Sequence, residues 1–223
     1  MAPLKTVIFM GSTRPSESPS PVIPGRLADR VCKFLVGNMA PDEFEVRVVD
    51  PSDDEYKLPL LEVPFHFAKF AKQPVSPALK KLVETATWAD AYIFLSPEYN
   101  HTIGPALINL VNHLPPAVYG GPLANKAGLI ITYSMGKFGG SRAAVQLRSL
   151  VAEAGAVVCP SALSIAEAHI FMDEEGNEIA GDGNTPITDN FQRAKNDLLF
   201  VGRALLKERQ AMASAKASKK GKL

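Results

Sequence analysis

Cysteine and histidine are scarce in this chain. Among 223 residues there are only two cysteines, Cys32 and Cys159, and four histidines, at positions 66, 101, 113 and 169. Neither set has metal-ligand spacing, and two cysteines do not make a disulfide framework. The sequence therefore predicts a protein of a reducing compartment, without a disulfide scaffold and without a metal site.

An excess of charge and a long apolar run are also missing. Lys and Arg total 24 against 23 Asp and Glu, a net charge of +1. This balance does not favour nucleic acid or an anionic membrane surface as a partner. The apolar runs are strand-length, shorter than the roughly 18 residues of a spanning helix. Because Met1–Val7 leads directly into an apolar run, no room remains for a signal peptide. We expect a soluble cytoplasmic protein with no membrane or nucleic-acid partner.

Short apolar runs alternate with helical patterns along the chain. Predicted strands lie at 7–10, 46–50, 92–95, 128–133 and from 157, and helices follow them. Runs without alternating polarity, separated by helices, favour a parallel sheet that is covered on both faces. With right-handed crossovers, the count suits a doubly wound α/β protein of the flavodoxin-like kind. We predict a five-stranded parallel sheet of order 2-1-3-4-5.

One domain is expected over residues 1–208, followed by a flexible basic tail over residues 209–223. The tail repeats Ala, Ser and Lys, a composition typical of a solvated terminus. Residues 51–73 form a connection that is too long to be idle in a compact domain. Residues 173–190 are polar and rich in Gly, as in a surface loop or hairpin.

Loop 1, Gly11–Arg14, follows the first predicted strand. Hydroxyls, an arginine and backbone N–H groups at the start of a helix suit a phosphate monoester. The residues do not match the dinucleotide pattern G-x-G-x-x-G or the P-loop pattern. Small polar residues after a strand also form ordinary turns, and that alternative stays open here.

Loop 2, Pro97–Asn100, follows the third predicted strand and reads Pro-Glu-Tyr-Asn. A rigid ring, a flat ring and amide groups suit a planar heterocycle better than a sugar or a metal. The alternative is a tight strand-to-helix turn in which Tyr99 packs on a neighbour.

Loop 3, Tyr133–Arg142, follows the fourth predicted strand. Its glycines at 136, 139 and 140 permit close backbone approach or positive φ, although a plain connection could use them too. All three loops fall at the carboxyl ends of strands, where doubly wound sheets bind ligands. This coincidence favours a single site at one sheet edge.

The chain resembles the NADPH-dependent FMN reductase family, the flavodoxin-like flavin, quinone, azo-dye and metal-ion reductases. The matching segments are Val7–Arg14, Ser96–Asn109, Tyr133–Arg148 and Ile170–Gly176. The resemblance implies that Ser12 and Arg14 bind the FMN phosphate. It implies isoalloxazine contacts, largely through backbone, from Pro97, Glu98, Tyr99 and Asn100. It also implies that Ser134 and Gly136 line the other edge of the flavin.

The chain departs from the family pattern at two places. A proline-rich insertion, residues 15–24, separates loop 1 from Gly25-Arg26, so Ser18 and Arg26 are only candidate phosphate ligands. In the helix after loop 2, Ile108–Asn112 lacks the charged residues that are common in the family.

The resemblance implies an enzyme in which hydride passes from NADPH or NADH to bound FMN. Electrons then pass to a small-molecule acceptor: a quinone, free flavin, ferric or other metal ion, or azo compound. No catalytic side chain is needed, since the flavin N5 carries the chemistry. The family also implies a homodimer or homotetramer. The alternatives are a flavodoxin-like electron carrier, a flavin-dependent sensor acting through a protein partner, and a flavin-free scaffold.

Overall fold

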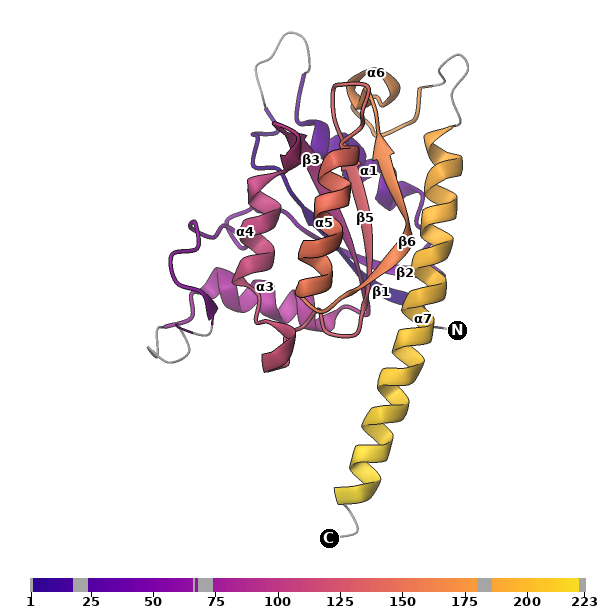
Figure 1. Ribbon diagram of the computed structural model, residues 1–223. Helices are drawn as coiled ribbons and strands as arrows, with labels where there is room; N and C mark the ends of the chain where they lie inside the picture. The colour runs from indigo at the N-terminus through magenta and orange to yellow at the C-terminus, as the bar shows by residue number, and fades with distance from the viewer. Residues whose placement is uncertain (1, 18–23, 66, 68–73, 180–185, 221–223) are drawn as a thin grey trace.

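A parallel β-sheet forms the centre of the protein (Figure 1). The computed structural model describes residues 2–17, 24–65, 67, 74–179 and 186–220. The strand order is β2-β1-β3-β5-β6, with the short β4 paired to β3. The strands are β1 (Leu4–Met10), β2 (Phe44–Val49), β3 (Ala91–Tyr99), β4 (Thr102–Ile103), β5 (Ala127–Tyr133) and β6 (Val157–Ile165). Counted over the five parallel strands, this is the predicted flavodoxin-like order, which is confirmed.

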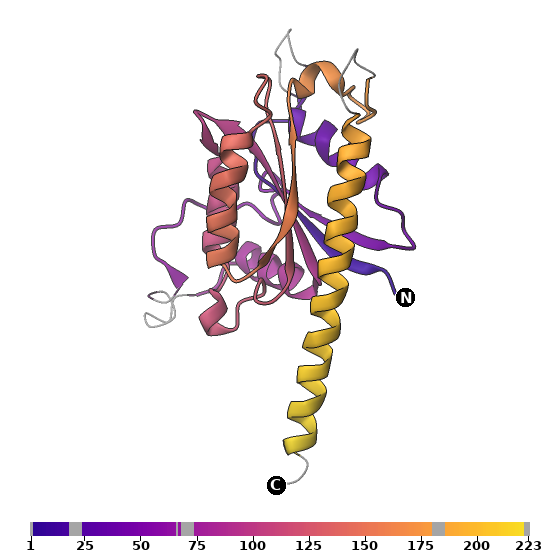
Figure 2. The ribbon, with the colours of Figure 1, turned by 45° about the vertical axis from the view of Figure 1, so that its right-hand side comes forward.

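Helices cover both faces of the sheet (Figure 2). One face is covered by α1 (Leu27–Gly37) and α7 (Ile187–Lys220). The other is covered by α3 (Pro77–Trp88), α4 (Pro105–His113) and α5 (Ser141–Glu153). The short helices are η1 (Ala117–Tyr119) and α6 (Ala168–Phe171). This three-layer arrangement explains why the central strands β1, β3 and β5 are apolar without alternation.

The strand β3 shows how the two cores form. Ile93 and Leu95 pack in the core under α1 and α7, whereas Tyr92 and Phe94 pack under α3, α4 and α5. Phe9 of β1 lies 5.6 Å from both Tyr92 and Phe94, measured between ring centroids. Burying one such side chain contributes about 1.5–3 kcal/mol. The alternating side chains of a single strand therefore tie both helix layers to the sheet.

Local signals fix the helices next to β3. Ser76 caps α3, since its Oγ accepts a hydrogen bond from the Leu79 N–H at 3.2 Å, and Pro77 follows at the first position. Pro105 opens α4 in the same way after Gly104. Asn109 of α4 holds residues 59–61 of the long connection after β2, because its amide accepts from Leu61 N at 3.0 Å and donates to the Pro59 carbonyl at 2.9 Å.

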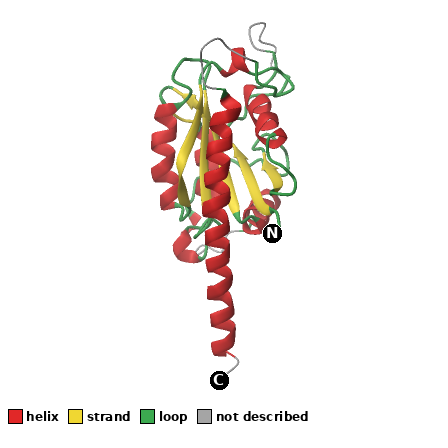
Figure 3. Cartoon of the chain, turned by 90° about the vertical axis from the view of Figure 1, so that its right-hand side faces the viewer, coloured by secondary structure: helices red, strands yellow, loops and turns green. Residues whose placement is uncertain are grey.

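The last helix continues through most of the residues after 208. Residues 209–220, expected as a flexible tail, continue helix α7, which extends beyond the sheet (Figure 3). Ala, Lys, Gln and Met all favour helix, and no Gly or Pro interrupts them before Gly221. Arg209 anchors this part through Asp90 at 2.8 Å and the Asn125 carbonyl at 3.0 Å. The predicted boundary at residue 208 therefore falls inside a helix. In the described ranges no helix has both the length and the apolarity to cross a bilayer.

Lys126 is buried at the amino end of β5. Its Nζ donates to the Thr87 carbonyl and to the Tyr92 hydroxyl, both at 3.1 Å. Burial, with a further contribution from Arg209, lowers the pKa of Lys126 to about 8, while Asp90 opposes the shift. The Lys126 amine is therefore protonated less readily in the folded protein than in the unfolded chain.

The stability of the protein should accordingly rise as the pH increases from about 8 to 10.5. In that window the unfolded chain binds the Lys126 proton and the folded chain releases it, which stabilises the fold by up to about 3 kcal/mol. Urea denaturation across this range should show a smaller rise for Lys126→Met. Lys80→Met, on the exposed side of α3, serves as the control and should keep the wild-type slope. Equal slopes for all three proteins would contradict the assignment.

Candidate functional site

The three candidate loops meet at one edge of the sheet. The strands β1, β3 and β5 are direct neighbours, with Met10 opposite Leu95 and Pro97 opposite Tyr133. Their carboxyl ends lie at the upper edge in Figure 1. The backbone of loop 1 lies close to β3, because Gly11 N donates to the Leu95 carbonyl at 2.8 Å. A Cβ at Gly104 would lie 2.6 Å from the Gly11 carbonyl oxygen, so only glycine permits this approach.

Loop 1 is anchored by Ser12. This residue is buried, and its Oγ accepts a hydrogen bond from Arg14 N at 3.3 Å. Arg14 itself is half-buried. The first helix, α1, begins at Leu27, after the insertion. The start of α1 nevertheless returns to loop 1, because Arg26 Nη2 donates to the Ser12 carbonyl.

Arg26 is held inside the protein. Its side chain is 1% exposed, and its guanidinium pairs with both carboxylate oxygens of Asp50 and with Asp29 at 3.2 Å. Burial raises the pKa of Asp50, but the bonds from Arg26 and Ser52 outweigh it and hold the pKa below its ordinary value. The terminal nitrogens of Arg26, a candidate phosphate ligand, are thus already bonded within the chain. Ser18, the other candidate from the insertion, lies outside the described residues.

Loop 2 forms the first half of a tight hairpin. The end of β3 pairs antiparallel with β4, with Glu98 opposite Ile103 and Tyr99 opposite Thr102. The two turn residues, Asn100 and His101, have φ of 49° and 63°. Positive φ at both positions is typical of the type I′ turn, which matches the twist of a hairpin. The hairpin leaves Tyr99 44% exposed, while Pro97 is buried.

The Glu98 side chain turns towards α5. Its carboxylate accepts from the backbone N–H groups of Arg142 at 3.1 Å and Ala143 at 3.2 Å, and from Arg142 Nε at 3.0 Å. The residue before the helix, Gly140, has no side chain, so Glu98 caps α5 in its place. Burial raises the pKa of Glu98, but these bonds outweigh it and the pKa ends below its ordinary value. Only the backbone of Glu98 remains for a ligand.

Loop 3 is shaped by two glycines with positive φ. A Cβ at Gly139 would lie 2.8 Å from Ala166 N, and one at Gly140 would lie 2.7 Å from the Thr132 Cβ. Thr132 Oγ1 donates to the Gly139 carbonyl at 3.1 Å. Ser134 Oγ donates to the Gly136 carbonyl at 2.8 Å and keeps the loop folded back on itself. Gly136 is exposed, so its backbone is open to a ligand.

Tyr133 is a site residue that the sequence did not single out. It is buried at the end of β5, where its hydroxyl hydrogen-bonds with Ser12 and lies near Tyr99. Burial raises the pKa of this phenol, so it stays protonated. Tyr133 thereby joins loop 1 to loop 3. On sequence alone, an aromatic residue at a strand end cannot be told from ordinary core.

Sequence comparison connects these loops to characterised proteins. Residues 4–170 match the sequence profile described as NADPH-dependent FMN reductase. The chain is also similar to a protein named quinone reductase from Escherichia coli strain K12. The two are 31% identical over 121 residues, which cover 54% of this chain and 60% of that relative. The match thus spans less than two thirds of the relative's length.

Solved structures share the fold. The flavoenzyme NAD(P)H:(acceptor) oxidoreductase FerB from Paracoccus denitrificans has a TM-score of 0.59 at 17% identity, covering 91% of this chain and 95% of that chain. An oxidoreductase from Corynebacterium diphtheriae has a TM-score of 0.59 at 14% identity, covering 90% and 97%. At such identities the likeness concerns the fold alone. The profile match confirms the predicted family, and the shared fold confirms the predicted fold class.

Replacing Glu98 by Ala should lower the free energy of unfolding by about 2–4 kcal/mol at pH 7, because the start of α5 loses its charged acceptor. Urea denaturation measures this loss. The stabilisation by Glu98 is present above the ordinary Glu pKa of 4.5 and disappears as the pH falls through the lowered folded-state pKa. The gap between wild type and variant should therefore close in acid.

The matched control is Glu153→Ala, which removes an exposed carboxylate at the opposite end of the same helix. It should change the unfolding free energy by no more than about 0.5 kcal/mol. If both variants lose the same stability, Glu98 is not the cap of α5.

Proposed function

Because the chain belongs to the NADPH-dependent FMN reductase family, we propose that loops 1, 2 and 3 bind FMN and that the protein is an NAD(P)H-dependent FMN oxidoreductase. The observation that supports this most is the meeting of the three loops at the carboxyl ends of β1, β3 and β5. In doubly wound sheets, ligands bind at this position.

The groups present at the edge suit the parts of FMN. Loop 1 offers the Ser12 hydroxyl and the Arg14 guanidinium, a donor set for a phosphate monoester. Loop 2 offers the half-exposed ring of Tyr99 and the backbone of a rigid hairpin. At Gly136 an added Cβ would meet only Ser134 Oγ, at 4.0 Å, so a flat ring can approach the backbone.

The proposed roles follow the three loops. Ser12 and Arg14 bind the phosphate, with Arg26 as a positioning residue that holds the Ser12 carbonyl rather than a phosphate ligand. Pro97, Tyr99, Asn100 and the Glu98 backbone form the isoalloxazine wall. Ser134 and Gly136 line its other edge.

Ser12, Arg14 and loops 2 and 3 would hold FMN, which when bound would supply hydride transfer from NADPH or NADH and electron transfer to an acceptor. The chain contributes placement and exclusion of water. The capping of α5 by Glu98 keeps loops 2 and 3 at a fixed separation, because this loop 2 carboxylate accepts from the N–H groups of Arg142 and Ala143 where loop 3 meets α5. Neither a nucleophile nor a general base is required of the chain.

Several acceptors fit an exposed flavin: quinones, free flavin, ferric or other metal ions, and azo compounds. Quinones are the first choice, since the relative from Escherichia coli carries the name quinone reductase. We further propose a homodimer or homotetramer that acts in the cytoplasm. The described residues include no cluster of three His, Cys, Asp or Glu side chains able to hold a metal ion.

The alternative function is a flavodoxin-like electron carrier or a flavin-dependent sensor. Flavodoxin-type carriers tend to be strongly acidic, whereas this chain has a net charge of +1. Steady turnover with NAD(P)H and a small acceptor distinguishes an enzyme from either alternative.

The purified protein should be yellow, or become yellow when loaded with FMN. Its visible absorbance should bleach on addition of NADPH or NADH and return when a quinone, ferric complex or azo dye is added. Repeated turnover should follow with excess co-substrate. A protein that stays colourless after exposure to FMN would refute the proposed function.

Arg14→Ala should raise the FMN dissociation constant about 10- to 100-fold, since one charged hydrogen bond is worth about 1.5–3 kcal/mol. Quenching of flavin fluorescence on binding measures this. The turnover rate at saturating FMN should change little, because Arg14 does not touch the reacting ring. Arg47→Ala, which removes an arginine stacked on Trp88 at 3.9 Å, should leave FMN affinity unchanged. If both variants bind FMN with the same affinity, Arg14 does not bind the phosphate.

A further inference from the structure

A groove of about 1000 Å³ lies at the amino end of the sheet, between the middle of α7 and the start of β1. The two elements touch at Gly202, where an added Cβ would lie 2.7 Å from Leu4 Cδ2 (Figure 3). Trp88 at the end of α3 and Asp90 before β3 also line the groove. None of its described lining residues belongs to loops 1, 2 or 3, which lie at the carboxyl ends of the strands. The groove is therefore separate from the proposed FMN site.

One wall of the groove is a face of α7. The lining residues of this helix recur every three or four positions from Asn196 to Gln210, which is the spacing of a single helix face. At a rise of about 1.5 Å per residue, this wall is about 21 Å long. Its apolar members include Leu199, Phe200 and Leu206, and Phe200 is 78% exposed. A ligand that covers this face must be elongated and largely apolar.

Two cations interrupt the apolar wall. Arg203 and Lys207 lie one turn apart on the lining face of α7. Neither side chain makes an ion pair or hydrogen bond with another residue that the structure describes, and the Nε of the half-buried Arg203 is buried without an acceptor. The carboxylate that lines the groove, that of Asp90, is already bound to Arg209 at 2.8 Å. The groove therefore offers positive charge that its own lining does not neutralise.

An anionic group suits the two cations better than a neutral one. A buried donor without an acceptor is destabilising, and the planar fork of an arginine can bind both oxygens of a carboxylate. Lys5 adds a third positive charge to the groove, with its Nζ 5.7 Å from the centre of the Trp88 ring. Charge and shape thus favour a ligand that has an anionic group and an extended apolar part.

We propose that this groove binds an amphipathic carboxylate, a molecule with one carboxylate at the end of a long hydrocarbon chain. The carboxylate pairs with Arg203 and Lys207, and the chain lies along α7 against Phe200. A short anion lacks the apolar contact, and a neutral chain leaves the two cations unpaired. Both parts of the ligand are therefore required. The proposal does not rest on the proposed function, because the groove shares no described residue with the FMN site.

The ligand class is tested by isothermal titration calorimetry with decanoate, with FMN present throughout to fill the proposed flavin site. Decanoate should bind the wild-type protein saturably. Acetate has the carboxylate without the chain, and 1-decanol has the chain without the charge. Each should bind about ten-fold more weakly or worse. If decanoate does not bind saturably, or if either of the other compounds binds as tightly, the proposal is overturned.

The position of the site is tested with the double variant Arg203→Met/Lys207→Met. The control, Arg193→Met/Lys216→Met, makes the same two changes on α7 at exposed positions that are not among the described lining residues. Decanoate affinity should fall about ten-fold or more in the groove variant, because its charged hydrogen bonds are lost, and stay close to wild type in the control. Equal affinity in the two variants overturns the site.

Thermal denaturation checks that the variants are folded. If the double variant does not fold, Phe200→Ser takes its place, since an exposed side chain can be shortened without opening the core. It should weaken decanoate binding several-fold, whereas Val145→Ser, at a 70% exposed position of α5, should not. Unchanged affinity in Phe200→Ser overturns the proposal. Failure of the protein to bind FMN refutes the proposed function instead, while the variants still report on the groove.

Discussion

The capping of α5 by Glu98 is the interaction on which the proposed site depends most. Loop 2 and loop 3 belong to different crossover units, and the Glu98 carboxylate joins them by accepting from Arg142 and Ala143. Because the side chain is only 5% exposed, water competes poorly for these bonds. A helix that starts after a glycine would otherwise leave its first N–H groups without a side-chain cap. The same contact therefore satisfies a helix start and sets the spacing of two loops.

Loop 1 is fixed by a different network. Arg26 donates to the Ser12 carbonyl while Asp50 and Asp29 hold its guanidinium. A buried ion pair adds little net stability by itself, since desolvation offsets the attraction. The effect of this ion pair is geometric. It brings the start of α1 next to loop 1, although the insertion separates the two in sequence. Tyr133 then connects Ser12 to the end of β5. Because Arg26, Asp29 and Asp50 pair with one another, the backbone of loop 1 and a few of its side chains remain to contact a ligand.

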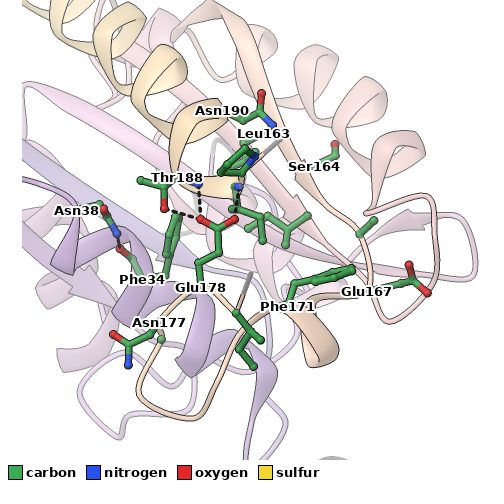
Figure 4. A pocket seen from close by; sticks show the side chains of 16 residues that line it. Phe34, Asn38, Leu163, Ser164, Glu167, Phe171, Asn177, Glu178, Thr188 and Asn190 are labelled. Atoms are coloured by element: carbon green, nitrogen blue, oxygen red, sulfur yellow. Dashed lines mark hydrogen bonds between the residues drawn. The ribbon is translucent and has the colours of Figure 1, made fainter. Parts of the chain in front are cut away.

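A second glutamate repeats the arrangement at α7. Glu178 accepts from residues at the start of that helix, as Glu98 does at α5 (Figure 4). In each case a carboxylate from a separate segment meets the positive end of a helix, where its charge is favourable.

Periodicity and local capping, which depend on neighbours in sequence, determined the five parallel strands and the start of α3 at Ser76. The handedness of crossovers then predicted the strand order. Periodicity also placed loops 1, 2 and 3 at one sheet edge, because parallel strands end together. The tertiary structure alone decided the rest. It directed Glu98 to a helix 44 residues away, Arg26 to Asp50, and Asn100-His101 into a hairpin turn. It also showed residues 209–220 as helix, with Arg209 bound to Asp90. Such partners are distant in sequence, and no local pattern identifies which carboxylate a buried donor will meet.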